Sequence, residues 1–221
     1  MNILQINSSV RGNQSESTRV TNAVVAKLAA ANPGATVTVR DLGANPHPVL
    51  DEAALGALFT PADQRTPEQA ARVALDDALI AEAQAADVIV LGAPMYNFGM
   101  PAQFKAYIDN IARVGRTFGF DRSRAGEPYW PLLAGMDKRL VILSSRGDFG
   151  YGPGQRIAHL NHVEGGVATA FGYIGITDVA SVAIEYDEFA DDRLRASIAA
   201  AEADVDTLVT RMAVGVSPEV A

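Results

Sequence analysis

Cysteine is absent from the 221 residues of this chain. Its absence excludes disulfide scaffolds, thiolate zinc sites and cysteine nucleophiles, and it fits a reducing compartment. The chain also lacks an excess of positive charge, since its formal net charge is −8 at pH 7. Long-range attraction to the phosphate backbone of a nucleic acid is therefore disfavoured as a mode of binding.

Long hydrophobic runs are missing as well. No apolar stretch approaches the roughly 20 residues that a membrane-spanning helix needs. The opening residues 1–6 are too short for the apolar core of a secretory signal, and the first positive charge is Arg11. We therefore expect a cytoplasmic protein that binds neither membrane nor nucleic acid. With 48% hydrophobic and 20% charged residues, the chain has the composition of a globular domain.

Three familiar sequence motifs are also absent from the chain. It contains no Gly-x-x-x-x-Gly-Lys-Ser/Thr loop for a nucleoside triphosphate and no Gly-x-Gly-x-x-Gly dinucleotide motif after a strand. It has no Gly-x-Ser-x-Gly elbow of a serine hydrolase either. His159 and His162 stand close together, but no carboxylate cluster accompanies them at metal-binding spacing, which disfavours a zinc site.

Strand and helix patterns alternate along the chain. Apolar and β-branched runs predict strands at residues 3–6, 36–39, 87–91, 139–144 and 178–184. Helical spacing predicts helices at residues 17–31, 52–59, 66–86, 102–114, part of 157–174, and 191–212. This alternation predicts a single α/β domain over residues 1–213, with a doubly wound parallel sheet and helices on both faces. Residues 214–221 are expected to form a flexible tail.

The loops that follow three predicted strands carry the candidate binding residues. In open α/β sheets, ligands bind beyond the carboxyl ends of the strands, so loops 7–17, 94–98 and 145–150 should meet at one crevice. Ser9, Ser15 and Ser17 lie before or at a helix start, where hydroxyls and free backbone N–H groups suit a phosphate monoester. The alternative is that one of these serines only caps the helix.

The second and third loops suit a flat heteroaromatic ring. The second places two aromatic residues, a methionine and an amide directly after a strand, so it offers apolar faces with polar groups at the edge. The third contains Gly147, which lets the backbone approach a ligand closely. The alternatives are an aromatic plug for the core and a simple turn. The aromatic-rich segment 116–137 is either a binding or assembly element or a flap over its own core.

Taken together, four segments resemble the FMN-dependent NADH-azoreductase and quinone reductase family. They are Ser8-Ser9 followed by Ser15-x-Ser17, Ala-Pro-Met-Tyr-Asn-Phe at 93–98, Ser-Arg-Gly at 145–147, and Phe-Gly-Tyr-Ile-Gly-Ile at 171–176. The segment 41–51 is also similar to that family. The resemblance extends from Ile3 to about Ile184.

The resemblance implies a flavodoxin-like fold with a five-stranded sheet, non-covalently bound FMN, and a homodimer with active sites at the subunit interface. The residues that it assigns to FMN are Ser9, Ser15, Glu16, Ser17, Met95, Tyr96, Asn97, Phe98, Ser145, Arg146, Gly147 and Asp148. Glu16 is expected to offer only its backbone N–H, because its carboxylate would repel phosphate. Asp148 stands where the family commonly has glycine, which would put a carboxylate near the pyrimidine edge of the flavin.

The implied activity is a two-step reduction, in which NADH or NADPH reduces FMN and the flavin then reduces a quinone or an azo compound. No side chain serves as a nucleophile, because the cofactor carries the chemistry. Phe120 and Phe171 are candidates to stack on a flat acceptor, or else pack in the core or an interface. A non-catalytic flavodoxin-type electron carrier and a regulatory module that binds a phosphosugar or nucleotide are the alternatives. The sequence decides neither the natural acceptor nor the choice between NADH and NADPH.

Overall fold

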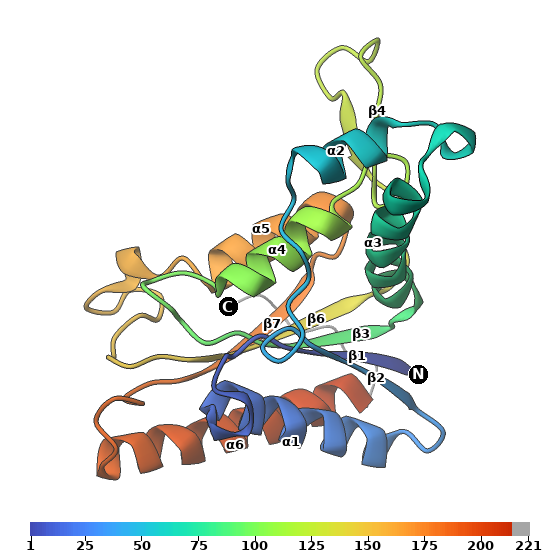
Figure 1. Cartoon of the computed structure of the whole chain (residues 1–221). Coiled ribbons are helices and arrows are strands. Elements are labelled where there is room, and N and C mark those ends of the chain that lie inside the picture. Colours follow the sequence, from blue (N-terminus) through green and yellow to red (C-terminus); the bar gives the residue numbers. More distant parts are fainter. Residues whose placement is uncertain (214–221) are drawn as a thin grey trace.

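The computed structural model describes residues 1–213, and a five-stranded parallel sheet with helices on both faces forms its centre (Figure 1). The strands are β1 (Asn2–Asn7), β2 (Thr36–Asp41), β3 (Val88–Gly92), β6 (Arg139–Ser145) and β7 (Asp178–Ile184), in the spatial order β2-β1-β3-β6-β7. The helices are α1 (Glu16–Ala31), α2 (Glu52–Phe59), α3 (Pro67–Ala85), α4 (Ala102–Ile111), α5 (Glu164–Ile174) and α6 (Asp192–Ala213). The predicted doubly wound architecture is confirmed.

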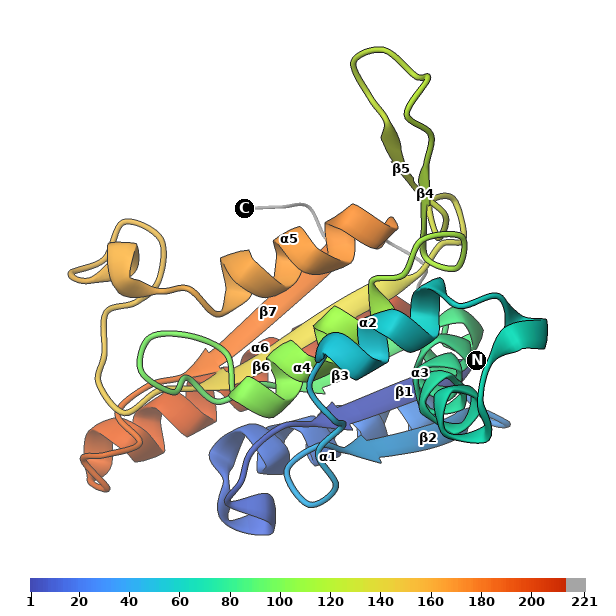
Figure 2. The same ribbon diagram turned by 45° about the horizontal axis from the view of Figure 1, so that its top comes forward.

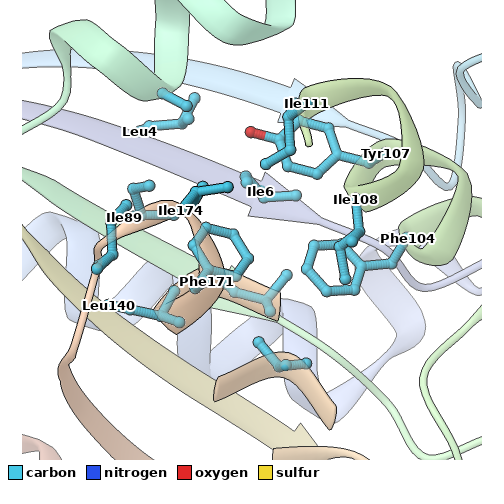
Figure 3. Close-up of a cluster of buried hydrophobic side chains, with 14 of the residues drawn as sticks. Leu4, Ile6, Ile89, Phe104, Tyr107, Ile108, Ile111, Leu140, Phe171 and Ile174 are labelled. Atoms are coloured by element: carbon cyan, nitrogen blue, oxygen red, sulfur yellow. The ribbon is translucent and has the colours of Figure 1, made fainter. Parts of the chain in front are cut away.

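Alternating side chains of the strands build a core on each side of the sheet. Leu4 and Ile6 of β1 point towards the face covered by α3, α4 and α5, whereas Ile3 points towards α1 and α6. On β3, Ile89 belongs to the core beneath α3, α4 and α5, and Val90 belongs to the core beneath α1 and α6. Figure 3 shows the first of these cores, where aromatic rings from α4 and α5 meet the strand side chains. Burial on both faces explains why the central strands are almost continuously apolar.

Most predicted boundaries agree with the structure. The predicted helix 52–59 and the predicted strand 178–184 have the bounds of α2 and β7. The helix predicted over 102–114 ends earlier, at Ile111, and the mixed segment 157–174 divides into a short 3₁₀ turn and α5. The predicted tail 214–221 lies outside the described residues. Among the helices of residues 1–213, none combines the length and hydrophobicity required to cross a bilayer.

The segment 116–137 contains a feature that the sequence patterns did not reveal. Strands β4 (Phe118–Phe120) and β5 (Tyr129–Pro131) pair as an antiparallel hairpin, which projects from the body of the molecule in Figure 2. The hairpin is anchored beside the C-terminal end of α5, where the N–H of Leu133 donates to the carbonyl of Ile174 (3.0 Å). It therefore lies at the end of the molecule away from the carboxyl ends of the strands (Figure 1).

Candidate functional site

The loops that follow β1, β3 and β6 meet at one end of the sheet, as predicted, and direct hydrogen bonds join them. The Tyr96 hydroxyl lies 3.2 Å from the Ser9 hydroxyl and accepts from the N–H of Val10 (3.3 Å). The N–H of Met95 donates to the carbonyl of Ser145 (2.8 Å). β1 lies between β2 and β3, so these loops surround the point where the chain's connections reverse direction across the sheet.

A cavity of about 170 Å³ opens between these loops. Its lining residues are Ser9, Arg11, Ser15, Pro94, Met95, Tyr96, Ser145, Gly147, Asp187 and Glu188. Six of these were predicted as cofactor ligands. Asp187 and Glu188 were missed, because only three loops were considered, although the loop after β7 ends at the same edge of the sheet. Arg11 and Pro94 were missed inside loops that had already been singled out.

The beginning of α1 provides a seat for an anion. Ser15 is the N-cap residue, but its hydroxyl bonds to the hydroxyl of Ser17 (2.9 Å) and not to a backbone N–H. Within residues 1–213, the N–H groups of residues 16–18 have no hydrogen-bond acceptor. Ser15, Ser17 and Thr18 are buried, so these unpaired donors and the positive end of the helix dipole favour a bound anion.

The Glu16 side chain turns away from this seat. Its carboxylate accepts a hydrogen bond from Arg19 Nε at 2.7 Å, one turn further along α1. Arg19 also pairs with Glu202 of α6 (2.9 Å). The predicted arrangement, in which Glu16 offers only its backbone to a ligand, therefore agrees with the geometry.

A strained turn forms the second wall. The N–H and carbonyl of Tyr96 both bond to the backbone of Gly99, and the residues between them, Asn97 and Phe98, have φ values of 48° and 71°. Positive φ at both central positions defines a type I′ turn, in which glycine is favoured and phenylalanine is costly. The N–H groups of Asn97 and Phe98 have no acceptor within the described chain, so the turn leaves two donors for a ligand.

The Arg146 side chain does not line the cavity. Its side chain is only 5% exposed and points into the protein, where it pairs with Glu164 of α5 and with Glu185 at the end of β7 (3.1 Å). Its backbone N–H and carbonyl are bonded to Ile184 and Asp187. The Arg146 guanidinium therefore faces these carboxylates and not the cavity, whose lining does not include Arg146, and a role in binding the cofactor stays a prediction. Arg146 fixes the loop after β6 in place.

Glu164 is the inner carboxylate of this ion network. Burial acts to raise its pKa, but the Arg146 guanidinium and a hydrogen bond from the Ser144 hydroxyl (2.6 Å) outweigh burial and lower the pKa. The Glu185 carboxylate accepts hydrogen bonds from the N–H groups of Gly150 (2.9 Å) and Tyr151 (3.0 Å), so the network also fixes the start of the glycine-rich segment 150–154.

Asp148 also lies apart from the cavity. Its carboxylate is exposed and accepts a hydrogen bond from Arg156 (2.7 Å), which lowers the pKa of Asp148. Asp148 is not among the lining residues. The carboxylate of Asp148 therefore faces Arg156 at the surface, and its placement beside the flavin stays a prediction.

The two aromatic candidates for substrate stacking lie elsewhere in the chain. Phe171 is fully buried, with its ring parallel to that of Phe104 at a centroid distance of 6.4 Å (Figure 3). It is a core residue, and the prediction of a stacking role is wrong. Phe120 is 42% exposed on the hairpin, where its ring packs at a tilt of 32° against that of Tyr129, and it is remote from the cavity of its own chain.

A larger hollow of about 450 Å³ lies beyond the C-terminal end of α4, whereas the loop cavity lies before its N-terminal end. Its walls are largely apolar and include Leu55, Phe59 and Val114. In residues 1–213 no cluster of three or more histidines and carboxylates could hold a metal ion.

The strand order and the crevice at the reversal point define a flavodoxin-like α/β protein. The family described as having a flavodoxin-like fold matches residues 1–208. An FMN-dependent NADH:quinone oxidoreductase of Aromatoleum aromaticum is 52% identical over 206 residues, which cover 93% of this chain and 98% of the relative. One from Dechloromonas aromatica is 47% identical over 210 residues, 95% of this chain and all of the relative.

A solved structure extends this likeness to three dimensions. The crystal structure of an azoreductase from Bacillus anthracis str. Sterne superposes with a TM-score of 0.82 at 26% identity, over 96% of this chain and 99% of the other. The chain therefore belongs to the family of flavodoxin-like FMN-dependent NADH:quinone oxidoreductases.

Proposed function

We propose that this protein is an FMN-dependent oxidoreductase that uses NADH to reduce quinones and azo compounds in a two-step cycle. The observation that carries the proposal is the meeting of three loops around the open start of α1, with backbone donors on both sides of one cavity. The names of relatives that cover 93 to 96% of this chain support the same activity.

The residues of the cavity fit the two ends of FMN. At the phosphate end, the Ser9 and Ser15 hydroxyls and the free N–H groups of residues 16–18 form a donor set without a nearby lysine. At the ring end, Met95 and the turn at 96–99 supply an apolar surface and two backbone donors. Gly147 keeps the opposite wall thin, since a Cβ there would lie 2.5 Å from the Glu188 side chain.

FMN bound here would supply the two-electron redox chemistry between NADH and the acceptor. The chain's contribution is to bind, orient and tune. The N–H groups of Asn97 and Phe98, which have no acceptor within the described chain, would hydrogen-bond the polar edge of the ring. The buried Arg146 network holds the loop after β6 against the other side.

We also propose that the protein works as a homodimer. The cavity of one chain is smaller than the roughly 300–1,000 Å³ of a complete small-molecule site, so one chain encloses only part of the cofactor. The hairpin and α5 expose Phe120, Tyr129 and Tyr173. A second copy would complete the site and bring an exposed hairpin aromatic such as Phe120 near an acceptor. A cytoplasmic location stays a prediction from the sequence.

The test is the spectrum and turnover of the purified protein. We expect flavin absorbance, and NADH oxidation that depends on menadione or methyl red. The variant Ser15→Glu places a carboxylate in the phosphate seat while still suiting a helix N-terminus, so it should fold and lose at least about 10-fold in FMN affinity. Thr207→Glu, at an exposed position inside α6 and outside the cavity lining, is the matched control.

A colourless protein that takes up no FMN would refute the proposal. FMN binding without NADH turnover, unless a partner reductase is added, would instead identify an electron carrier. Equal FMN affinity in Ser15→Glu and Thr207→Glu would show that phosphate does not bind at the start of α1.

A further inference from the structure

We infer that Arg11 recognises the phosphate of the bound flavin nucleotide, and that it does so by exchanging its present partner, Asp187, for that phosphate. The inference rests on the proposed function and adds a residue to it. Arg11 belongs to the loop after β1 and Asp187 to the loop after β7, so their ion pair crosses the cavity mouth.

Arg11 is in the right place for this role. Arg11 and Ser15 line the same cavity, on either side of the turn that leads into α1. The backbone of Arg11 is held by a hydrogen bond from its N–H to the Ser9 hydroxyl (3.2 Å), while its side chain is 55% exposed. A fixed backbone and a free side chain allow the guanidinium to turn without disturbing the loop.

The charges at the cavity require such a cation. Among the lining residues that belong to the described part of the chain, Arg11 alone is positively charged, and Asp187 and Glu188 are negatively charged. Glu16, next to the anion seat, is balanced by Arg19. The lining alone therefore carries a net negative charge, and a phosphate monoester brings a further charge of about −1.5 to −2. A guanidinium that turns to the phosphate reduces this repulsion and offers two parallel hydrogen bonds.

The pair with Asp187 is weak enough to be exchanged. Its single contact, from Arg11 Nη1 to Asp187 Oδ2, measures 3.3 Å, longer than a well-formed charge-assisted hydrogen bond. Burial, together with the neighbouring carboxylates of Glu16 and Glu188, raises the pKa of Asp187 although Arg11 acts to lower it. Arg146 provides the contrast, since it is buried between two carboxylates and cannot leave them.

If Arg11 exchanges Asp187 for phosphate, substitutions of Arg11 and of Asp187 should change FMN affinity in opposite directions. Arg11→Gln removes the cation that the phosphate would gain, so FMN affinity should fall by about 10-fold or more. Asp187→Asn removes the competitor and one negative charge, so FMN affinity should rise several-fold. Riboflavin, which lacks the phosphate, should bind both variants within about 2-fold of the parent protein.

The experiment measures the dissociation constants of FMN and riboflavin by quenching of flavin fluorescence, on apo-protein of the full chain. It compares the parent, Arg11→Gln, Arg11→Lys, Asp187→Asn and the Arg11→Gln/Asp187→Asn double variant. Arg11→Lys keeps the charge without the planar fork and should fall between the parent and Arg11→Gln. In the double variant the gain from Asp187→Asn should shrink, because no arginine is left to release.

The matched control is Arg195→Gln, which removes another exposed arginine paired with a carboxylate, Asp192, outside the cavity. It should leave both affinities unchanged. Equal losses of FMN and riboflavin affinity in Arg11→Gln, or weaker FMN binding in Asp187→Asn, would overturn the inference and leave the proposed function intact. Failure of the parent protein to bind either flavin would overturn both.

Discussion

At the scale of single residues, the turn after β3 is the clearest case of local strain placed at the site. Asn97 and Phe98 both have positive φ, a combination that favours Asn-Gly rather than Asn-Phe. Proline cannot replace Asn97 to delete its N–H, because a ring-locked φ near −65° is incompatible with the observed 48°. The strain is retained where it orients two donors and an aromatic ring that is 46% exposed.

The cost of that strain can be measured by changing Phe98. We expect Phe98→Val to unfold with about 1–2 kcal/mol less free energy than Phe98→Gly, because a β-branched side chain tolerates positive φ poorly. Both variants remove the aromatic ring, so each is the control for the other. Urea denaturation of the apo-proteins gives the two values, and equal stabilities would mean that the turn is unstrained.

At the scale of elements, α3 shows how completely a local signal can define a boundary. The Thr66 hydroxyl accepts from the N–H of Gln69, and the Gln69 side-chain oxygen accepts from the N–H of Thr66, which together form a capping box. Pro67 occupies the first helical position. The start predicted from these residues is confirmed. Strands β4 and β5 were not predicted because each has only three residues, too few to show a periodic pattern. Within the hairpin the Trp130 ring packs against Gly119, and this contact leaves no periodic signal in the sequence.

The capping contribution has a direct test. Thr66→Ala should lower the free energy of unfolding by about 1 kcal/mol, because the N–H of Gln69 loses its acceptor. Thr207→Ala, at an exposed position inside α6, should leave stability unchanged or raise it by a few tenths, roughly 0.5 kcal/mol at most, since alanine is the better helix former. Chemical denaturation gives the free energy of unfolding of each variant. If Thr66→Ala were no more destabilising than Thr207→Ala, the cap at Thr66 would not stabilise α3.

At the scale of the whole molecule, Arg146 and its two carboxylates connect β6, α5 and β7 beneath the site. The network is buried, and Arg146 Nε and Glu164 Oε2 have no hydrogen-bond partner within the described chain. Loss of one member leaves an uncompensated charge among the others, which is costly inside a protein. The loop after β6 and the packing of α5 on the sheet are therefore coupled.

This coupling predicts a pH dependence of stability. The pKa of Glu164 is lowered on folding, so its contribution is complete above its ordinary value of 4.5 and is lost as the pH falls through the lower, folded value. Glu164→Gln should cost about 2 kcal/mol at pH 7, because Arg146 loses a charged partner. The difference between parent and variant should shrink below pH 4.5. Urea midpoints measured from pH 3 to 7 test this, and a constant difference would contradict it.

The sequence by itself determined the order of the elements and the edge of the sheet where the site lies. Apolar periods, caps and breakers act over a few residues, so the five main strands, the start of α3 and the three converging loops could be predicted. The tertiary structure alone decided which side chains face the cavity. The Arg146 side chain pairs with Glu164 and Glu185, and the Phe171 ring packs against Phe104, all of them distant in the sequence. Asp187 and Glu188, in the loop after β7, line the cavity. Such choices depend on contacts between residues far apart in the chain, which no local pattern encodes.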